Sequence, residues 1–590
     1  MKLRYLTLCA IAMGVAPMVM ANTVSESQPM LISADSIASE AAAQPELTGW
    51  QKFKQTPFCN YFSKSRLNGA VQTEFLIPFE DEAIGTGTYD SPVLNNTYFD
   101  LTFNAPYLSV GARLQVTEWP LPGFENDFKG WGVPYIWATG SYKWAQLTVG
   151  DFYQQFGSGL VLRSYEERSL GIDNAIRGGR LKLNPIDGLS FTALGGKQRR
   201  YWDWNDSWVW GGDVEWSFNE TFRNAFNPKF GWSMGFSYVG KYEGDEDIFT
   251  PDMNYKLNLP NKIAAFDVRT KFRIRNFNIL AEFATKSSDP NADNGYIYRP
   301  GTAALLSATY SSKGFSAFLQ AKRSDNMSFR SKRSMVGVSS FINHMPAFTT
   351  TQTYALAAMY PYATQPDGEW AFQGEVRYNF KRKTPLGGRY GTQVRVSGSY
   401  IAGLNRNYPD PSNPVNVIGS DGAGAAFWEM GQTFYADANI EINKKLTKNL
   451  SLTLFYLYQN YNQAVVEGHG HNGDMVKSNI FVLEGQWKMS KKCQLRWEMQ
   501  YLQTKQDRGD WIAGLVELSV APDWMFTITD TYNIGETNLN YYSALVTYTY
   551  KANRFQVGYG RTRAGYNCSG GVCRWVPASK GFTIAYNYTF

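Results

Sequence analysis

From Leu67 onward the chain alternates apolar and polar residues in stretches of about ten. The last of these stretches is GFTIAYNYTF. One face carries Phe582, Ile584, Tyr586, Tyr588 and Phe590, and the other carries Thr583, Ala585, Asn587 and Thr589. Successive side chains of a β-strand point to opposite faces. The pattern therefore predicts a strand with one apolar and one mildly polar face, repeated along the chain.

The connections between these stretches alternate in length. Segments such as LTFNAPYLSVGARLQV and ALVTYTYKANRFQVGYG read as hairpins with tight turns, and KANR, VAPDW, KMSKK and NKKLTKN fall at such turns. Longer polar segments lie between the hairpins: LPGFENDFKGWG, GKYEGDEDIFTPDMNYKLNLP, residues 402–431 and VVEGHGHNGDMVK. Short turns at one end and long loops at the other are typical of a transmembrane antiparallel β-barrel, with about 26 strands (22–28) here. The number of strands is least certain at one stretch, which reads either as a strand or as a loop: RSMVGVSSFINHMPAFTTTQTY.

Composition agrees with an all-β chain. Aromatic residues make up 16% and charged residues 18%, and mean hydropathy is −0.36, whereas a bundle of membrane helices needs apolar runs of about 20 residues. The alternative is a secreted sandwich or propeller, which predicts repeats of roughly 40–50 residues that the sequence lacks. Aromatic clusters at strand ends favour the barrel, whose membrane interfaces carry aromatic girdles. The net charge of +6 is spread along the chain and does not indicate nucleic-acid binding.

The first 21 residues read as a secretory signal peptide. Lys2 and Arg4 precede a short apolar core, and Val19-Met20-Ala21 forms a small-residue cleavage site; the alternative is a membrane helix. We expect residues 22–65 to be a flexible periplasmic leader and residues 66–590 to be the barrel. This organisation predicts the outer membrane of a Gram-negative bacterium.

The terminal strand also predicts partners. Alternating aromatics that end on Phe590 resemble the signal that outer-membrane proteins present to the barrel insertion machinery. The residues assigned to that signal are Phe582, Ile584, Tyr586, Tyr588 and Phe590. Outer-membrane lipid is the other expected partner.

One segment, residues 156–180, has mixed charge and a helical pattern between glycines. We expect it to fold into the lumen, where its charged residues pair with the wall: Arg163, Glu166, Glu167, Arg168, Arg177 and Arg180. The alternative is an ordinary external loop. The short leader leaves no room for the globular plug of a TonB-dependent transporter.

Four cysteines follow the signal peptide. Cys568 and Cys573 flank a Gly-rich turn, and in an exported protein they predict a disulfide. The alternative is two free thiols or half of a metal site. Cys59 and Cys493 receive no assignment.

Three further clusters are candidate sites. EGHGHNGD places His469 and His471 near two carboxylates as a weak metal candidate, and EGDEDIFTPD is a weak calcium candidate without EF-hand spacing; solvated loops explain both. RRYWDWNDSWVW suits stacking on a sugar or, preferably, an interfacial girdle. We therefore predict no catalytic residue, no cofactor and no enzyme activity.

Family resemblance covers most of the mature chain. The stretches GDFYQQFGSGLVLRSYEERSLGIDNAIRGGRL, YPYATQPDGEWAFQGEVRYNF and TPLGGRYGTQ resemble a family of uncharacterised Bacteroidota outer-membrane barrels, a domain of unknown function. The resemblance implies fold and location and transfers no functional residue. Two functions stay open: a porin-like channel for hydrophilic or amphipathic solutes, or a non-conducting barrel that docks surface lipoproteins or other barrels.

Overall fold

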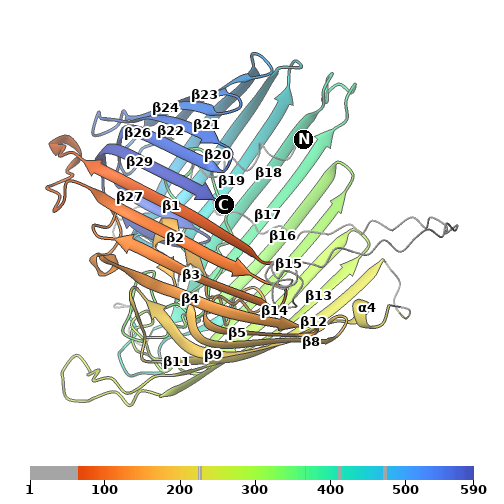
Figure 1. Ribbon diagram of the computed structural model, residues 1–590, viewed down its shortest axis with the longest axis vertical. Coiled ribbons are helices and arrows are strands. Elements are labelled where there is room, and N and C mark those ends of the chain that lie inside the picture. Colours follow the sequence, from red (N-terminus) through yellow and green to blue (C-terminus); the bar gives the residue numbers. More distant parts are fainter. Residues whose placement is uncertain (1–63, 224, 226–228, 366, 409–414, 469–474) are drawn as a thin grey trace, which may run out of the picture.

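The chain forms a closed antiparallel β-barrel (Figure 1). The computed structural model describes residues 64–590 except 224, 226–228, 366, 409–414 and 469–474. The expected signal peptide and nearly all of the expected leader therefore lie outside the described residues, as do Cys59, His469 and His471. The barrel closes with 24 strands, within the range expected from the sequence.

Each wall strand pairs with the next along the chain, and the last pairs with the first. The first half of the wall consists of β1 (Arg66–Pro78), β2 (Leu94–Asn104), β3 (Leu108–Thr117), β4 (Gly130–Tyr142), β5 (Ala145–Phe152), β8 (Ile176–Ile186), β9 (Leu189–Arg200), β11 (Trp208–Ser217), β12 (Phe230–Tyr242), β13 (Lys262–Ile274), β14 (Phe277–Lys286) and β15 (Gly301–Ser312). The second half consists of β16 (Phe315–Asp325), β17 (Gly368–Phe380), β18 (Thr392–Asn407), β19 (Gly424–Lys445), β20 (Leu450–Asn462), β21 (Met475–Lys488), β22 (Cys493–Thr504), β23 (Trp511–Val520), β24 (Trp524–Asn533), β25 (Asn540–Tyr550), β26 (Asn553–Thr562) and β29 (Ser579–Thr589).

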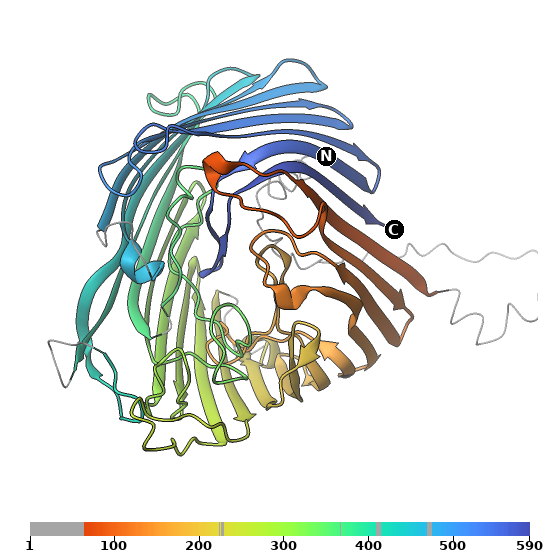
Figure 2. The same ribbon diagram turned by 90° about the vertical axis from the view of Figure 1, so that its left-hand side faces the viewer.

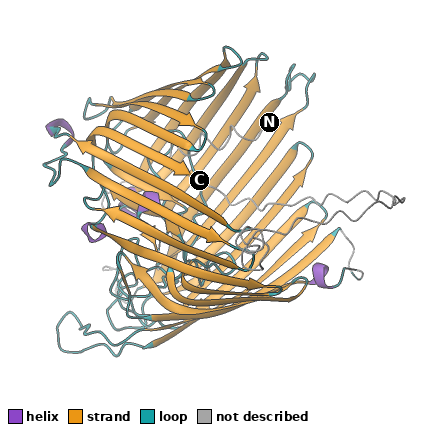
Figure 3. Cartoon of the chain, in the orientation of Figure 1, coloured by secondary structure: helices purple, strands orange, loops and turns teal. Residues whose placement is uncertain are grey.

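Small elements decorate the loops (Figure 3). They are the strands β6 (Glu166–Glu167), β7 (Ile172–Asp173), β10 (Asp203–Trp204), β27 (Gly565–Ser569) and β28 (Val572–Val576), the 3-10 turns η2 (Glu82–Ile84), η3 (Asn126–Phe128) and η4 (Arg168–Leu170), and the helices α4 (Phe218–Thr221) and α5 (Gln463–Val466). Across the described residues, no helix combines the length and apolarity needed to cross a membrane.

The alternating pattern orients the wall strands. On β14, Phe283 is 46% exposed on the outside, whereas its neighbour Glu282 is 4% exposed on the lumen side. The same parity places Phe277 outward and Lys286 inward. The polar face of each strand therefore lines the lumen, and the apolar face forms the outer belt.

The barrel seam involves the last residue of the chain. The backbone N–H of Phe590 donates to the carbonyl of Gly69 at 2.9 Å, and the Gly69 N–H donates to the Phe590 carbonyl at 3.1 Å. The Phe590 ring lies directly over Gly69, where any Cβ would overlap it. Phe582 and Phe590 are both exposed on the outer face, and the ring of Phe590 stacks on Tyr588. The terminal strand thus closes the sheet and covers its seam.

The two ends of the barrel differ. The turns at Lys551, Pro522, Lys491 and Lys448 lie at one end, and the long connections lie at the other (Figure 1). On β24 the outward Trp524 and Tyr532 mark the two aromatic levels of the belt. They are separated by eight residues, which at roughly 3.3 Å per residue corresponds to about 26 Å along the strand. Because barrel strands are tilted by about 35–45°, this corresponds to roughly 20 Å along the barrel axis, close to the height of about 25 Å of the apolar band on transmembrane barrels.

Candidate functional site

Two long connections at the loop end fold back inside the barrel. They are residues 153–175, between β5 and β8, and residues 326–367, between β16 and β17; we call them the first and second internal loops. Figure 2 looks into the barrel from this end and shows orange and green chain within the ring of strands. Several apolar side chains of these loops are completely buried: Leu160, Val161, Leu162, Phe329, Ile342 and Leu356. These side chains belong to one hydrophobic core, which they share with buried, lumen-facing side chains of the wall such as Leu457, Ile480 and Leu502.

The internal loops hold each other through their backbones. The Arg163 N–H donates to the Ile342 carbonyl at 2.8 Å, and the His344 N–H donates to the Gly159 carbonyl at 3.0 Å. The Asn343 side chain donates to the carbonyls of Leu160 and Met327 at 2.9 and 2.7 Å. The two loops consequently behave as one packed unit.

This unit reaches opposite walls. Gln198 of β9 donates to the carbonyl of Phe341 at 2.6 Å, and Gln500 of β22 accepts from the N–H of Leu356 at 3.0 Å. In the closed order β9 is the seventh strand and β22 the nineteenth, so they stand twelve places apart in a ring of 24. The second internal loop therefore crosses the lumen.

An ion-pair network ties the first internal loop to the wall. Arg113 of β3 is 5% exposed and donates to both carboxylate oxygens of Glu166 at 2.8 and 2.9 Å. The same guanidinium donates to Asp100 of β2 at 2.7 Å and lies 3.4 Å from Asp173. Arg168 joins Asp100 to Glu166 at 2.8 and 2.7 Å. Buried charges that are paired and hydrogen-bonded in this way fix the geometry of the loop.

The structure distributes the residues that the sequence suggested for the lumen over three settings. Glu166 and Arg168 join the wall network, and Glu167 accepts from the N–H of Ser169 at the start of η4. Arg163 stacks on the ring of Tyr165, with the guanidinium carbon 4.5 Å from the ring centre.

Arg177 and Arg180 belong to strand β8 and not to the loop. Arg180 faces the lumen and donates to the Tyr153 carbonyl at 2.8 Å. Arg177 has the opposite parity, pairs with Asp151 at 2.7 Å and covers Trp204. The loop ends at Ala175, so the range 156–180 ran five residues into the wall.

Tyrosine hydroxyl groups hold the part of the second internal loop around residues 354–360, which we call its far arm. The Tyr354 hydroxyl donates to Glu484 of β21 at 2.8 Å, and the Tyr360 hydroxyl donates to Asp507 at 2.9 Å. Burial, reinforced by those carboxylates, raises the pKa of both tyrosines well above the ordinary value. These phenols therefore remain donors at physiological pH.

The sequence carries only a weak signal for this second loop. That signal is a long interval without clear alternation between FSAFLQAKRSD and GEWAFQGEVRYNF, which fits either a strand or a loop. Periodicity cannot tell a loop that folds inward from one that extends outward. Contacts with strands far along the chain decide that.

The histidine and cysteine candidates fall as follows. His344 is buried in the second internal loop, and burial together with the charges of Arg163 and Lys322 lowers its pKa to about 3. Cys568 and Cys573 are joined by a disulfide in the β27–β28 hairpin, and Cys493 is a free, half-buried thiol.

In the EGDEDIFTPD loop, Lys256 pairs with Asp245 and Asp247 at 2.7 Å each. The part of the chain that the structure describes holds no group of three or more His, Cys, Asp or Glu suited to a metal.

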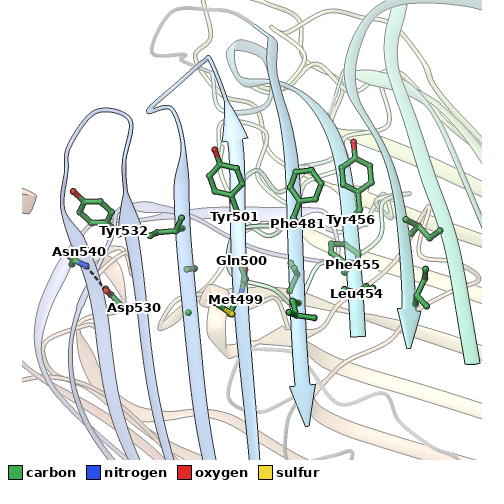
Figure 4. Close-up of a pocket in the computed structure, with 17 residues that line it drawn as sticks. Leu454, Phe455, Tyr456, Phe481, Met499, Gln500, Tyr501, Asp530, Tyr532 and Asn540 are labelled. Atoms are coloured by element: carbon green, nitrogen blue, oxygen red, sulfur yellow. Dashed lines mark hydrogen bonds between the residues drawn. The ribbon is translucent and has the colours of Figure 1, made fainter. Parts of the chain in front are cut away.

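One large hollow lies on the outer surface. It has a volume of about 1090 Å³, and Figure 4 shows it along strands β19 to β25 with Tyr456, Phe481 and Tyr501 in a row. Its lining is dominated by outward residues such as Leu454 and Met499, so it belongs to the apolar belt. A hollow of about 750 Å³ lies on the lumen side near the short turns, lined by Lys271, Arg273 and Asn278 among others.

The closed barrel, its apolar belt and its folded-in loops define a transmembrane β-barrel of the outer-membrane type. The chain belongs to a family of unknown function (DUF6029), whose model matches residues 53–590. No curated protein shows a significant match to the chain.

Solved structures that resemble the chain are barrels. They include the siderophore receptor PirA from Pseudomonas aeruginosa (10% identity, TM-score 0.39, 89% of this chain and 80% of that chain). The outer membrane protein opdK from Pseudomonas aeruginosa is also similar (13% identity, TM-score 0.35, 68% of this chain and 94% of that one). OccAB3 from Acinetobacter baumannii is a third (9% identity, TM-score 0.34, 90% and 99%). The likeness is one of fold and carries nothing about substrate.

Proposed function

We propose that this protein is a channel in the outer membrane of a Gram-negative bacterium, one that passes hydrophilic or amphipathic solutes when its internal loops move. The observation that carries the proposal is the crossing of a polar lumen by a loop unit held through side-chain bonds to opposite walls, from Gln198 to Gln500. Membrane lipid would cover the outer belt, and the insertion machinery would read the terminal strand.

The two anchors of the loop unit differ in strength. On the β3 side, Arg113 makes a buried and Arg168 a half-buried ion pair, whereas on the β21–β22 side Tyr354 and Leu356 each make one hydrogen bond. A single hydrogen bond contributes about 0.5–1.5 kcal/mol, or about 1.5–3 kcal/mol when one partner is charged. Opening would therefore begin at the far arm of the second internal loop.

Planar-bilayer conductance of the purified protein tests the proposal. Asp325 and Gly368 are directly paired, so a two-residue Asn-Gly turn can replace 326–367 and close β16 onto β17. We expect the shortened protein to conduct more than the full chain and to admit larger solutes. As a matched control, an Asn-Gly turn replaces residues 249–256, the tip of an outer loop joined by the bond from the Leu257 N–H to the Ile248 carbonyl at 2.8 Å. Its conductance should equal that of the full chain.

A non-conducting barrel that docks surface lipoproteins or other barrels is the second candidate. The complete burial of Leu160, Leu162 and Leu356 within the lumen favours it, because such a core resists opening. In that case conductance stays near zero in the full chain and in the control. Partners that co-purify with the full chain would then be lost when 326–367 is removed.

A further inference from the structure

A small pocket opens at the loop end, beside the internal loops. It has a volume of about 290 Å³ and lies between residues 200–207, which are the end of β9 and its connection to β11, and residues 243–246 of the next long loop. Ser331 and Lys332 of the second internal loop complete it. We call it the mouth pocket.

Three donors of the mouth pocket lack an acceptor. Ser207 is 3% exposed, and its hydroxyl has no hydrogen-bond partner among the described residues. The indole N–H of Trp204 and the Nε of Arg200 are likewise buried without a partner in the described chain. Buried polar groups are normally bonded, so this concentration of unused donors indicates a ligand that accepts hydrogen bonds.

Acceptors line the same pocket. Asp203 and Glu246 contribute carboxylates that form no ion pair within the described residues, although Ser334 donates to Glu246 at 3.4 Å. The other lining acids have cation partners: Glu243 lies 2.9 Å from Lys241, Asp245 lies 2.7 Å from Lys256, and the exposed Asp206 lies 3.9 Å from Lys197. The pocket therefore offers donors and free carboxylates together.

This combination selects the chemistry of the ligand. An anion would be repelled by Asp203 and Glu246, and a simple cation would meet Arg200 and Lys332. A hydroxyl group both donates and accepts, so a neutral polyhydroxylated ring satisfies both sets. A volume of 290 Å³ equals that of about ten liquid-water molecules, which suits a sugar ring and not a folded partner.

We propose that the mouth pocket binds a neutral saccharide, with Ser207 and Trp204 donating to it and Asp203 and Glu246 accepting from its hydroxyls. The inference deepens the proposed channel and rests on it for the role of the pocket as an entry site. Asn205 donates to Ser331 at 2.7 Å and to Ser340 at 3.0 Å, so the pocket wall is bonded to the second internal loop. A bound sugar would thus touch the wall and the movable loop at once.

Calorimetric titration of the purified full chain tests the site. The probes are glucose, galactose and maltose, with inorganic phosphate and calcium chloride as comparisons. We expect saccharide binding in the millimolar range, weakened at least tenfold by Ser207→Ala and by the double variant Asp203→Asn and Glu246→Gln. The matched control is Asp252→Asn, an exposed acid farther along the loop that contributes residues 243–246, outside the pocket lining, whose bonds to Thr250 and Asn254 are local.

The outcomes separate the site from the channel. Three outcomes would overturn the proposed saccharide site. They are no saccharide binding at tens of millimolar, saccharide binding that the pocket variants leave unchanged, and binding of phosphate or calcium in place of sugar. Circular dichroism of each variant shows whether a loss reflects unfolding, and competition by a second saccharide on the wild-type chain gives an independent readout. Saccharide binding by a barrel that never conducts keeps the site and refutes the channel.

Discussion

At the scale of single residues, arginine side chains fix the first internal loop to the wall. Arg113 faces Asp100, Glu166 and Asp173, and its planar guanidinium bridges wall and loop as a point charge could not. The sequence marked Glu166 as a lumen residue but could not name Arg113, since the two are far apart in the chain. The local sequence pattern identifies which charged residues face the lumen, and only the three-dimensional structure shows which of them pair.

Replacing Arg113 with alanine should release the first internal loop. Three carboxylates would lose a buried cation, and breaking a buried pair costs about 3–5 kcal/mol. Hydrogen-exchange protection of residues 153–175 should fall accordingly. Arg223→Ala removes an exposed pair with Asp187 and should change protection by about 0–1 kcal/mol; equal effects of the two changes would contradict the role given to Arg113.

The seam residue Phe590 should matter more than another outward ring on its strand. Phe590→Ala uncovers Gly69 and removes the terminal ring, whereas Phe582→Ala truncates an exposed ring of the same strand away from the chain end. We expect less folded protein in the outer membrane for Phe590→Ala, measured by heat-modifiable mobility of membrane fractions. Wild-type levels would argue against a role for the ring in insertion or closure.

At the scale of elements, the strands lie where the alternating pattern predicts them, whereas the extent of some connections differs from the prediction. Residues 402–431 read as a loop, yet β18 extends to Asn407 and β19 begins at Gly424, so part of this segment is strand. Pairing of β18 with β19 extends the hairpin despite a glycine-rich and polar sequence. Cross-strand partners override local propensity in such cases.

The second internal loop should loosen in acid. His344 has a folded pKa of about 3 against an ordinary 6.5, so undocked loop binds the proton more readily. The loop is then docked with its full stability above about pH 6.5. Below that pH the free energy of docking becomes less favourable, by about 2 kcal/mol at pH 5.

Hydrogen-exchange protection factors for residues 326–367, corrected for intrinsic rates, at pH 7.5 and 5.0 measure this effect. His344→Gln cannot be protonated in this range and should flatten the dependence. An identical acid response in the variant would assign the effect to other groups.

At the scale of the whole molecule, the backbone pairing of the wall does not involve the internal loops. All 24 strands are paired on both sides without help from the internal loops. Polar bonds and an apolar core shared with the wall hold the loop unit inside.

The shortened protein that lacks 326–367 should consequently remain a folded barrel. We expect β-rich circular dichroism and heat-modifiable mobility close to those of the full chain, with a lower melting temperature because the buried contacts of Tyr354, Leu356 and Tyr360 are lost. The chain shortened at 249–256 should melt like the full chain. An unfolded product would mean that the loop unit is needed for the wall to form.

The sequence by itself determined the wall: strand alternation, turn positions, the outward terminal face and a lumen of mixed charge. These follow from local rules, because side-chain parity and turn chemistry depend on neighbours in the chain. Tertiary structure alone decided that residues 326–367 cross the lumen, that Glu166 meets Arg113, and that Ser207 and Glu246 share a pocket. Each of those facts depends on contacts between strands far apart in sequence, and a one-dimensional pattern carries no information about which strands lie opposite one another.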